Sequence, residues 1–165
     1  APGRGAAGEA GEAGEGPGWS PLGYRRRATA SSHAPGRVAL YAVDQSMITW
    51  WQPADGDATP WIEIDLGPAR FLVHALRLVW KDVGLDYKAG ILPGPFRWRL
   101  SLRDGPDGAW RCVVVASDNE VDLLIDYREL AEPAPATRVR LEVTGWPAGL
   151  RPGLVDFAVF GQALR

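Results

Sequence analysis

The stretch Phe96-Arg-Trp-Arg-Leu-Ser-Leu-Arg103 decides the fold class, because its side chains alternate strictly in character. Apolar residues occupy positions 96, 98, 100 and 102, and arginine or serine occupies positions 97, 99, 101 and 103. A period of two is typical of a β-strand that buries one face and leaves the other in water. The stretch therefore predicts a strand with a wet, arginine-rich side.

The sequence on both sides of this stretch repeats the same pattern. Turn residues at 104–108 lead into a return strand that carries Trp110, Cys112 and Val114. Alternation recurs at 62–66, 139–143 and 155–159, whereas 71–80 is more apolar and is expected to be a central strand. Only 38–43 could form a helical turn. The pattern predicts an all-β, antiparallel β-sandwich or jelly roll.

The chain of 165 residues fits one domain with a tail. Residues 1–18 are rich in glycine, alanine and glutamate and contain no large apolar side chain. Such a segment cannot bury enough surface to offset the entropy lost on ordering, so a disordered linker is expected there. The β-sandwich domain is assigned to 19–165, and the linker implies a neighbouring domain.

The charges and the single cysteine exclude several classes of protein. Eighteen basic and twenty acidic residues give a formal net charge of −2, which offers no overall attraction for nucleic acid. No stretch is long and apolar enough to span a membrane. Cys112 cannot form a disulfide within the chain or a cysteine-based zinc site, and its apolar neighbours suggest a small buried side chain.

Several segments resemble a known family in their order and spacing. They are Ala28-Thr-Ala-Ser-Ser32, Ala42-Val-Asp44, Thr49-Trp-Trp51, Trp61-Ile-Glu-Ile-Asp-Leu-Gly67 and Val155-Asp-Phe-Ala-Val-Phe-Gly161. Together they resemble the discoidin, or coagulation factor 5/8 type C, family, which includes the family-32 carbohydrate-binding modules. Residues 90–99, 118–119 and 126–127 resemble versions attached to bacterial glycoside hydrolases. The resemblance covers residues 28–161.

The resemblance implies an eight-stranded, galactose-binding-domain-like jelly roll with sheets of five and three strands. It places ligand-binding loops at one end, usually for sugars and sometimes for lipid or protein. It also implies a structural calcium ion held by Asp44, the Thr49 hydroxyl and Asp156. Gln45 and Ser46 replace the glycine and second acid usual in the family, which weakens this expectation. The alternative is that Asp44 caps a turn and Asp156 faces solvent on a strand.

A sugar site needs an exposed aromatic ring for the C–H face and polar side chains for the hydroxyl groups. Long loops on a rigid sandwich commonly carry such residues. The candidate ligand-binding residues are Trp50, Trp80, Lys81, Asp82, Asp86, Tyr87, Asp118, Asn119, Trp146 and Arg151. For each of them core packing or a solvated loop is the competing interpretation. Trp51, Trp61, Trp98 and Trp110 are expected to pack within the domain.

A catalytic role has the least support. The chain has two histidines, His33 and His74, and lacks the nucleophile-elbow, zinc-protease and phosphate-loop motifs. Loop acids could in principle hydrolyse a glycoside, but such acids are common on surfaces. The leading hypothesis is therefore a secreted, bacterial, non-catalytic module that binds carbohydrate and targets a tethered glycoside hydrolase. The alternative is a structural module that packs on a neighbouring catalytic domain without binding sugar.

Overall fold

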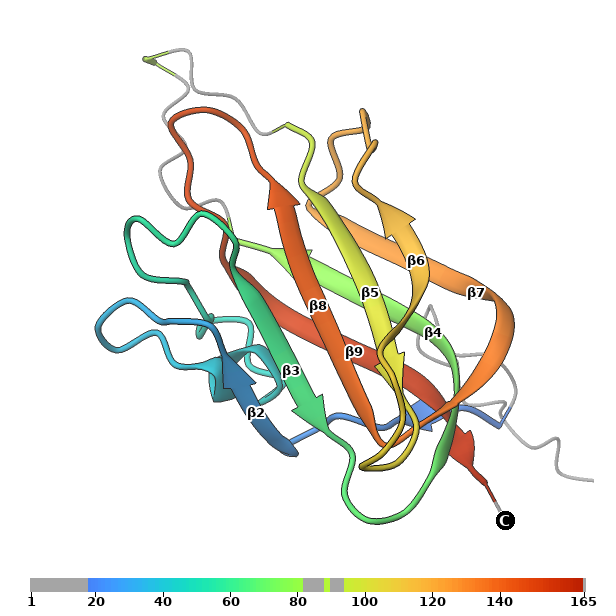
Figure 1. The fold of residues 1–165 in the computed structure, drawn as a ribbon. Coiled ribbons are helices and arrows are strands. Elements are labelled where there is room, and N and C mark those ends of the chain that lie inside the picture. Colours follow the sequence, from blue (N-terminus) through green and yellow to red (C-terminus); the bar gives the residue numbers. More distant parts are fainter. Residues whose placement is uncertain (1–17, 82–87, 90–93, 165) are drawn as a thin grey trace, which may run out of the picture.

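The computed structural model describes residues 18–81, 88–89 and 94–164 and shows two antiparallel sheets packed face to face (Figure 1). One sheet has the order β1-β9-β4-β7 and the other β2-β3-β8-β5-β6. The elements are β1 Ser20–Pro21, β2 Arg27–Ala30, the 3₁₀ helix η1 Ala39–Ala42, β3 Trp61–Asp65, β4 Phe71–Trp80, β5 Arg97–Arg103, β6 Arg111–Ala116, β7 Ile125–Ala136, β8 Arg138–Gly145 and β9 Leu154–Ala163.

The predicted all-β antiparallel sandwich is confirmed, with one difference in strand number. The described residues form nine strands, because the two-residue β1 pairs with the end of β9 and adds a fourth strand to the smaller sheet. The linker predicted for 1–18 lies, apart from Gly18, outside the described residues. No helix in the described ranges is long and apolar enough to cross a membrane.

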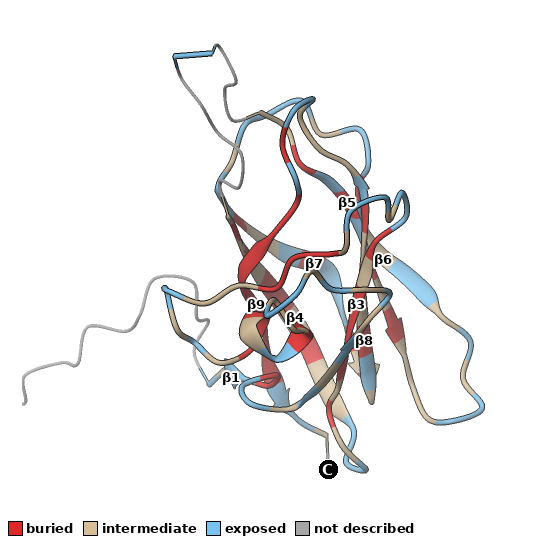
Figure 2. Cartoon of the chain, turned by 90° about the vertical axis from the view of Figure 1, so that its left-hand side faces the viewer, coloured by how far each residue is buried: buried red, intermediate tan, exposed pale blue. Residues whose placement is uncertain are grey.

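Alternate residues of each strand form the core between the sheets (Figure 2). In β5 the residues Trp98, Leu100 and Leu102 are buried, as the alternation predicted, and their neighbours face outward. Trp51 and Trp98 are completely buried. The indole N–H of Trp98 donates a 3.2 Å hydrogen bond to the buried carboxylate of Asp126, which Arg128 neutralises at 2.7 Å.

The expected burial of Cys112 was wrong. The β5–β6 register shifts between Leu100 and Ser101, so Leu100 pairs with Val114 and Ser101 pairs with Cys112. The extra residue on β6 turns Cys112 to the exposed side of an edge strand, where its thiol is free. Trp61 and Trp110 are likewise only half-buried, at the outer surface of the sheet.

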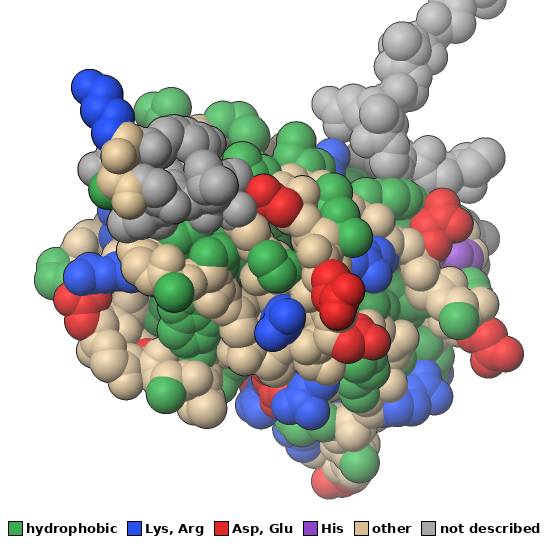
Figure 3. Space-filling model, turned by 90° about the horizontal axis from the view of Figure 1, so that it is seen from above, with side chains coloured by type: hydrophobic (Ala, Val, Ile, Leu, Met, Phe, Trp, Pro, Cys, Tyr) green, Lys and Arg blue, Asp and Glu red, His purple; other side chains and the backbone are tan. Residues whose placement is uncertain are grey.

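The strand directions gather four connections at one end of the sandwich, which we call the loop end. β2 and β3, β4 and β5, β6 and β7, and β8 and β9 are all joined there (Figure 1). The loops from 31–60 and 146–153 belong to this end. Figure 3 looks down on it and shows acidic and basic side chains close together, with apolar side chains between them.

Candidate functional site

A pocket of about 300 Å³ opens at the loop end between two segments. One wall is the turn 53–57, and the other consists of Trp146, Arg151 and Pro152. Trp146 is half-buried: it packs against the core and also lines the pocket. The structure thus brings together two of the predicted ligand-binding residues, Trp146 and Arg151, which lie on the same loop.

The opposite wall adds two carboxylates that the sequence did not single out. Asp55 forms an ion pair with Arg151, with a 2.6 Å separation between Oδ1 and Nη1. Both side chains are more than half exposed, at 66% and 55%, so water can replace this contact easily. A ligand hydroxyl can therefore insert between guanidinium and carboxylate without a large cost.

Asp57 fixes the turn 53–57 to the end of β2. Its Oδ2 accepts hydrogen bonds from the hydroxyls of Ser31 at 2.6 Å and Ser32 at 2.5 Å. Each hydroxyl also accepts a backbone N–H, from Trp61 and Ala54 respectively, both at 3.0 Å. The carboxylate therefore ties together the three segments that carry the pocket wall.

These hydrogen bonds also determine how Asp57 titrates. Burial raises the pKa of the Asp57 carboxyl, but the bonds from Ser31, Ser32 and the backbone of Thr59 lower it by more. The net result is a pKa below the usual value, so the group carries its negative charge throughout the neutral range. The pocket consequently offers an indole, a guanidinium and carboxylate oxygens to a ligand.

Trp50 does not line this pocket, and basic side chains already cover its ring. The Arg37 guanidinium carbon is 3.3 Å from the centre of the ring, and the Lys81 ammonium is 4.9 Å from it. The indole N–H donates to the side chain of Gln52 at 3.2 Å. A sugar cannot stack on the face that Arg37 covers, so the predicted platform at Trp50 is instead a contact between loops.

Gly153 makes this arrangement possible. A Cβ atom at that position would lie 3.1 Å from Cδ1 of Trp50 and 3.2 Å from Cβ of Lys81. A side chain at this position would require its neighbours to shift by a few tenths of an ångström, so glycine suits the close approach to Trp50. Backbone hydrogen bonds join the same segments, from Lys81 to the carbonyl of Gly153 at 2.7 Å.

Two other predicted ligand-binding residues have structural roles. Trp80 is 3% exposed and stacks on Phe96 inside the core, so the prediction that it meets a ligand was wrong. It continues the inward series of Leu76 and Leu78 along β4. The Asn119 amide donates to the carbonyls of Phe96 and Val121 and accepts the N–H of Val121, so it fixes its own loop.

The other predicted residues are placed as follows. Asp118 is exposed on the loop between β6 and β7 and does not line the pocket. Asp82, Asp86 and Tyr87 lie outside the described residues. Asp55, Asp57, Ser31 and Ser32 were missed, because hydrogen bonds between loops leave no periodic signal in the sequence.

The structure joins two of the predicted calcium ligands, Asp44 and Thr49, and engages the third, Asp156, with an arginine. The backbone N–H of Ser46 donates to Oδ1 of Asp44 at 3.0 Å, which is the turn cap that the alternative interpretation described. The Thr49 hydroxyl donates to Oδ2 of the same carboxylate at 2.6 Å. Asp156, however, is 5% exposed and pairs with Arg77 at 3.1 Å, so a guanidinium already neutralises it. Calcium requires six to eight oxygen ligands. In the described ranges no three Asp, Glu, His or Cys side chains gather into a metal site.

Comparisons with solved structures identify the fold. Chitosan-binding module 1 from a chitosanase/glucanase of Paenibacillus sp. IK-5 superposes with a TM-score of 0.70 and 24% identity, over 86% of this chain and 99% of the module. The family 32 CBM of NanJ from Clostridium perfringens, determined with galactose, gives a TM-score of 0.68 and 15% identity, over 86% and 98%. The fold is that of the family-32 carbohydrate-binding modules.

The family-32 fold also occurs within a larger protein. A family 89 glycoside hydrolase from Clostridium perfringens matches 86% of this chain with a TM-score of 0.68 and 17% identity, although the match covers only 14% of that enzyme. No family model matches the sequence. No curated protein matches it either.

Proposed function

We propose that this chain is a non-catalytic module that binds carbohydrate in the pocket between 53–57 and Trp146. One observation carries the proposal: a half-buried tryptophan, an arginine and two aspartates converge at the loop end of this fold. The indole suits the C–H face of a pyranose ring, and the charged groups suit its hydroxyls. The chitosan-binding and galactose-bound modules with the same fold support a saccharide as the ligand.

The state of Asp57 argues against glycoside hydrolysis in the same pocket. A glycosidase needs one carboxylic acid with a raised pKa to protonate the leaving oxygen. Hydrogen bonding instead lowers the pKa of Asp57, and Asp55 is engaged with Arg151. These carboxylates are suited to accepting hydrogen bonds from hydroxyl or ammonium groups of a sugar.

The proposed biological role is to keep a tethered, secreted glycoside hydrolase near its polysaccharide. The family 89 hydrolase supports this role, because it carries the fold as a small part of a long chain. Shallow sites of this kind bind weakly, and tethering raises the effective concentration of the enzyme at the substrate.

Isothermal titration with chitotriose and galactose tests the proposed site. Trp146→Ala and Arg151→Ala should each weaken binding of the recognised sugar by about tenfold or more, the effect expected of an anchoring residue. Trp19→Ala is the matched control, because Trp19 stacks on His74 at 4.5 Å on a different surface. A sugar that binds the wild type and the Trp146→Ala variant equally would overturn the assignment.

The docking alternative has one observation in its favour. Trp80 is buried and Trp50 is covered by Arg37, so Trp146 is the one tryptophan left as a platform among the described residues of the loop end. Removing the module from its parent protein separates the two functions. Lost activity on insoluble substrate alone supports targeting, whereas lost thermal stability of the catalytic domain supports docking.

A further inference from the structure

The outer face of the five-stranded sheet carries a concentration of positive charge that the net charge of the chain conceals. Its register places one side of β2, β3, β5 and β8 in solvent. Six arginines and three acids occupy these outward positions: Arg27, Arg97, Arg99, Arg103, Arg138 and Arg140, with Glu63, Asp65 and Glu142. The face is therefore basic on a chain whose formal charge is −2.

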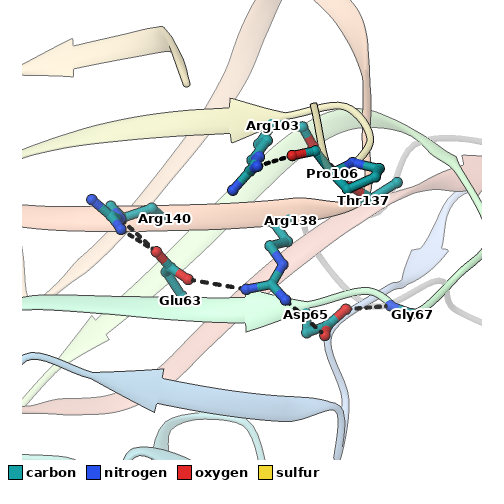
Figure 4. Close-up of polar contacts among 8 residues, drawn as sticks. All are labelled: Glu63, Asp65, Gly67, Arg103, Pro106, Thr137, Arg138 and Arg140. Atoms are coloured by element: carbon teal, nitrogen blue, oxygen red, sulfur yellow. Dashed lines mark hydrogen bonds and ion pairs between the residues drawn. The ribbon is translucent and has the colours of Figure 1, made fainter. Parts of the chain in front are cut away.

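Arginines of this face engage all three acids, and Figure 4 shows the contacts of Glu63 and Asp65. Glu63, only 9% exposed, pairs with both Arg140 and Arg138, and Arg138 also reaches Asp65 at 3.5 Å. On the neighbouring strands Arg99 pairs with Glu142 at 2.6 Å. Because the arginines of this face outnumber its carboxylates, a net positive charge remains after these ion pairs form. The buried Nε of Arg103 has no hydrogen-bond partner.

Two tryptophans lie in the same surface. The guanidinium carbon of Arg140 is 4.7 Å from the ring centre of Trp61 and 4.7 Å from that of Trp110. Trp61 is on the outer side because Ile62 and Ile64 take the inward positions of β3, and Arg140 lies near both tryptophan rings there. Arg140 covers one face of each ring, and the part of Trp61 that lines the adjoining hollow is the part that a sugar can contact.

The surface is hollowed at both ends of this row of charges. One hollow, of about 400 Å³, is lined by Trp61, Arg99 and Glu142. The other, of about 460 Å³, is lined by Asp65, Arg103 and Arg138. The positions of Trp61 and Asp65 on β3 are separated by about 13 Å at 3.3 Å per residue, so the track is longer than a single sugar ring.

We propose that this face binds an anionic polysaccharide whose charges are carboxylates, as in a polyuronate. A planar carboxylate matches the fork of a guanidinium, and Arg99 and Arg103 lie at the two hollows. Glu63, Asp65 and Glu142 lie among these arginines, and this alternation suits a polymer in which neutral hydroxyl groups separate the charged groups. A nucleic acid strand carries a phosphate about every 3.4 Å, which is a denser series of charges than these separated arginines match. The two hollows of this second surface share no lining residue with the loop-end pocket.

Binding of polygalacturonate to the whole chain tests the proposal, at ionic strengths of about 0.01 M and about 0.15 M to vary the screening. Arg99→Gln combined with Arg103→Gln should weaken binding about tenfold at the lower strength, because two charge-assisted contacts are lost. Glu142→Gln should strengthen binding, because it removes a negative charge from the same face. Arg25→Gln should leave affinity unchanged, because Arg25 is an exposed arginine outside the sheet.

Three results would overturn the proposal. One is an equal loss in Arg25→Gln and the double variant, which would indicate a nonspecific effect of net charge. Another is binding of fully methyl-esterified polygalacturonate, which is neutral, as tightly as the acid form. The third is tighter binding of duplex DNA than of the polyuronate. If the double variant has a lower melting temperature than the wild type, the proposal is judged only by comparing the polygalacturonate affinities of Glu142→Gln and Arg25→Gln.

Titration of chitotriose or galactose to these variants separates the two surfaces. Neutral sugar binding at the loop end should survive in the double variant. Failure of the polyuronate proposal would therefore leave the loop-end site standing, and failure of the loop-end site would leave this face untouched.

Discussion

The indole ring of Trp80 lies flat on the ring of Phe96, with the centroids 4.5 Å apart and the planes inclined by 6°. The two residues end β4 and precede β5, so the contact joins the two sheets directly below the loop end. Its position shows that an aromatic residue at a strand end can hold the loops in place without meeting a ligand.

Trp80→Ala should therefore destabilise the fold by about 3–5 kcal/mol, the usual cost of removing a buried aromatic side chain. Trp80→Phe should cost much less, because it keeps the stacking and removes an indole N–H that has no partner in the core. Chemical denaturation measures both. Equal costs for the two variants would show that the stacking contributes little.

Asp57→Ala should destabilise the pocket wall by about 2 kcal/mol, because two hydroxyls and a backbone N–H lose a charged acceptor. Asp55→Ala is the control, since its ion pair with Arg151 is exposed and should contribute little. Urea denaturation compares the two variants. A larger cost for Asp55→Ala would contradict the assigned roles.

Stability should also fall in acid because of Asp57. Its pKa is lower in the folded chain than in the unfolded chain, so its contribution is fully present above about pH 4. That contribution is lost as the pH falls from about 4 through the depressed pKa. Asp57→Asn should flatten this part of the profile of unfolding free energy against pH. A profile that the variant leaves unchanged would show that other groups dominate.

Calcium should leave the melting temperature of the wild type within about 1 °C of its value in EDTA, because Arg77 already neutralises Asp156. Arg77→Gln should cost about 3 kcal/mol, because it leaves the Asp156 carboxylate buried without a partner. Added calcium should restore part of that loss. A rise of several degrees in the wild type would show that calcium binds despite the ion pair.

Gly153→Ala should destabilise the chain by about 1–3 kcal/mol, because the added methyl group would crowd Trp50, Lys81 and the carbonyl of Trp51 within 3.1–3.3 Å. Gly94→Ala is the matched control, with a nearest neighbour 3.6 Å away. Thermal unfolding compares them. Similar stability of the two variants would show that the loops around Trp50 adjust freely.

Residue alternation predicted the sandwich and much of its core. The burial of Trp98, Leu100 and Leu102 followed directly from the arginines between them. The burial of Trp80 could have been predicted in the same way, because Leu76, Leu78 and Trp80 are spaced by two. The exposure of Cys112 could not, since a register shift in the β5–β6 pair leaves no mark in the composition.

Only one wall of the loop-end pocket could be predicted from the sequence. Tryptophan and arginine in a loop rich in glycine and proline marked one wall, at Trp146 and Arg151. The other wall depends on Asp57 meeting Ser32, which lies 25 residues away. The basic outer face shows a related difficulty, because the sum of the charges says nothing about which strands lie side by side.

The pairing of β1 with the end of β9 has a consequence for any protein that carries this module. Ser20 lies opposite Gly161, so the polypeptide enters and leaves the sandwich at neighbouring points (Figure 1). Both points are at the pole remote from Trp146. Partner domains joined there would leave the loop end pointing outward, and the length of the connecting segments would set how far it reaches.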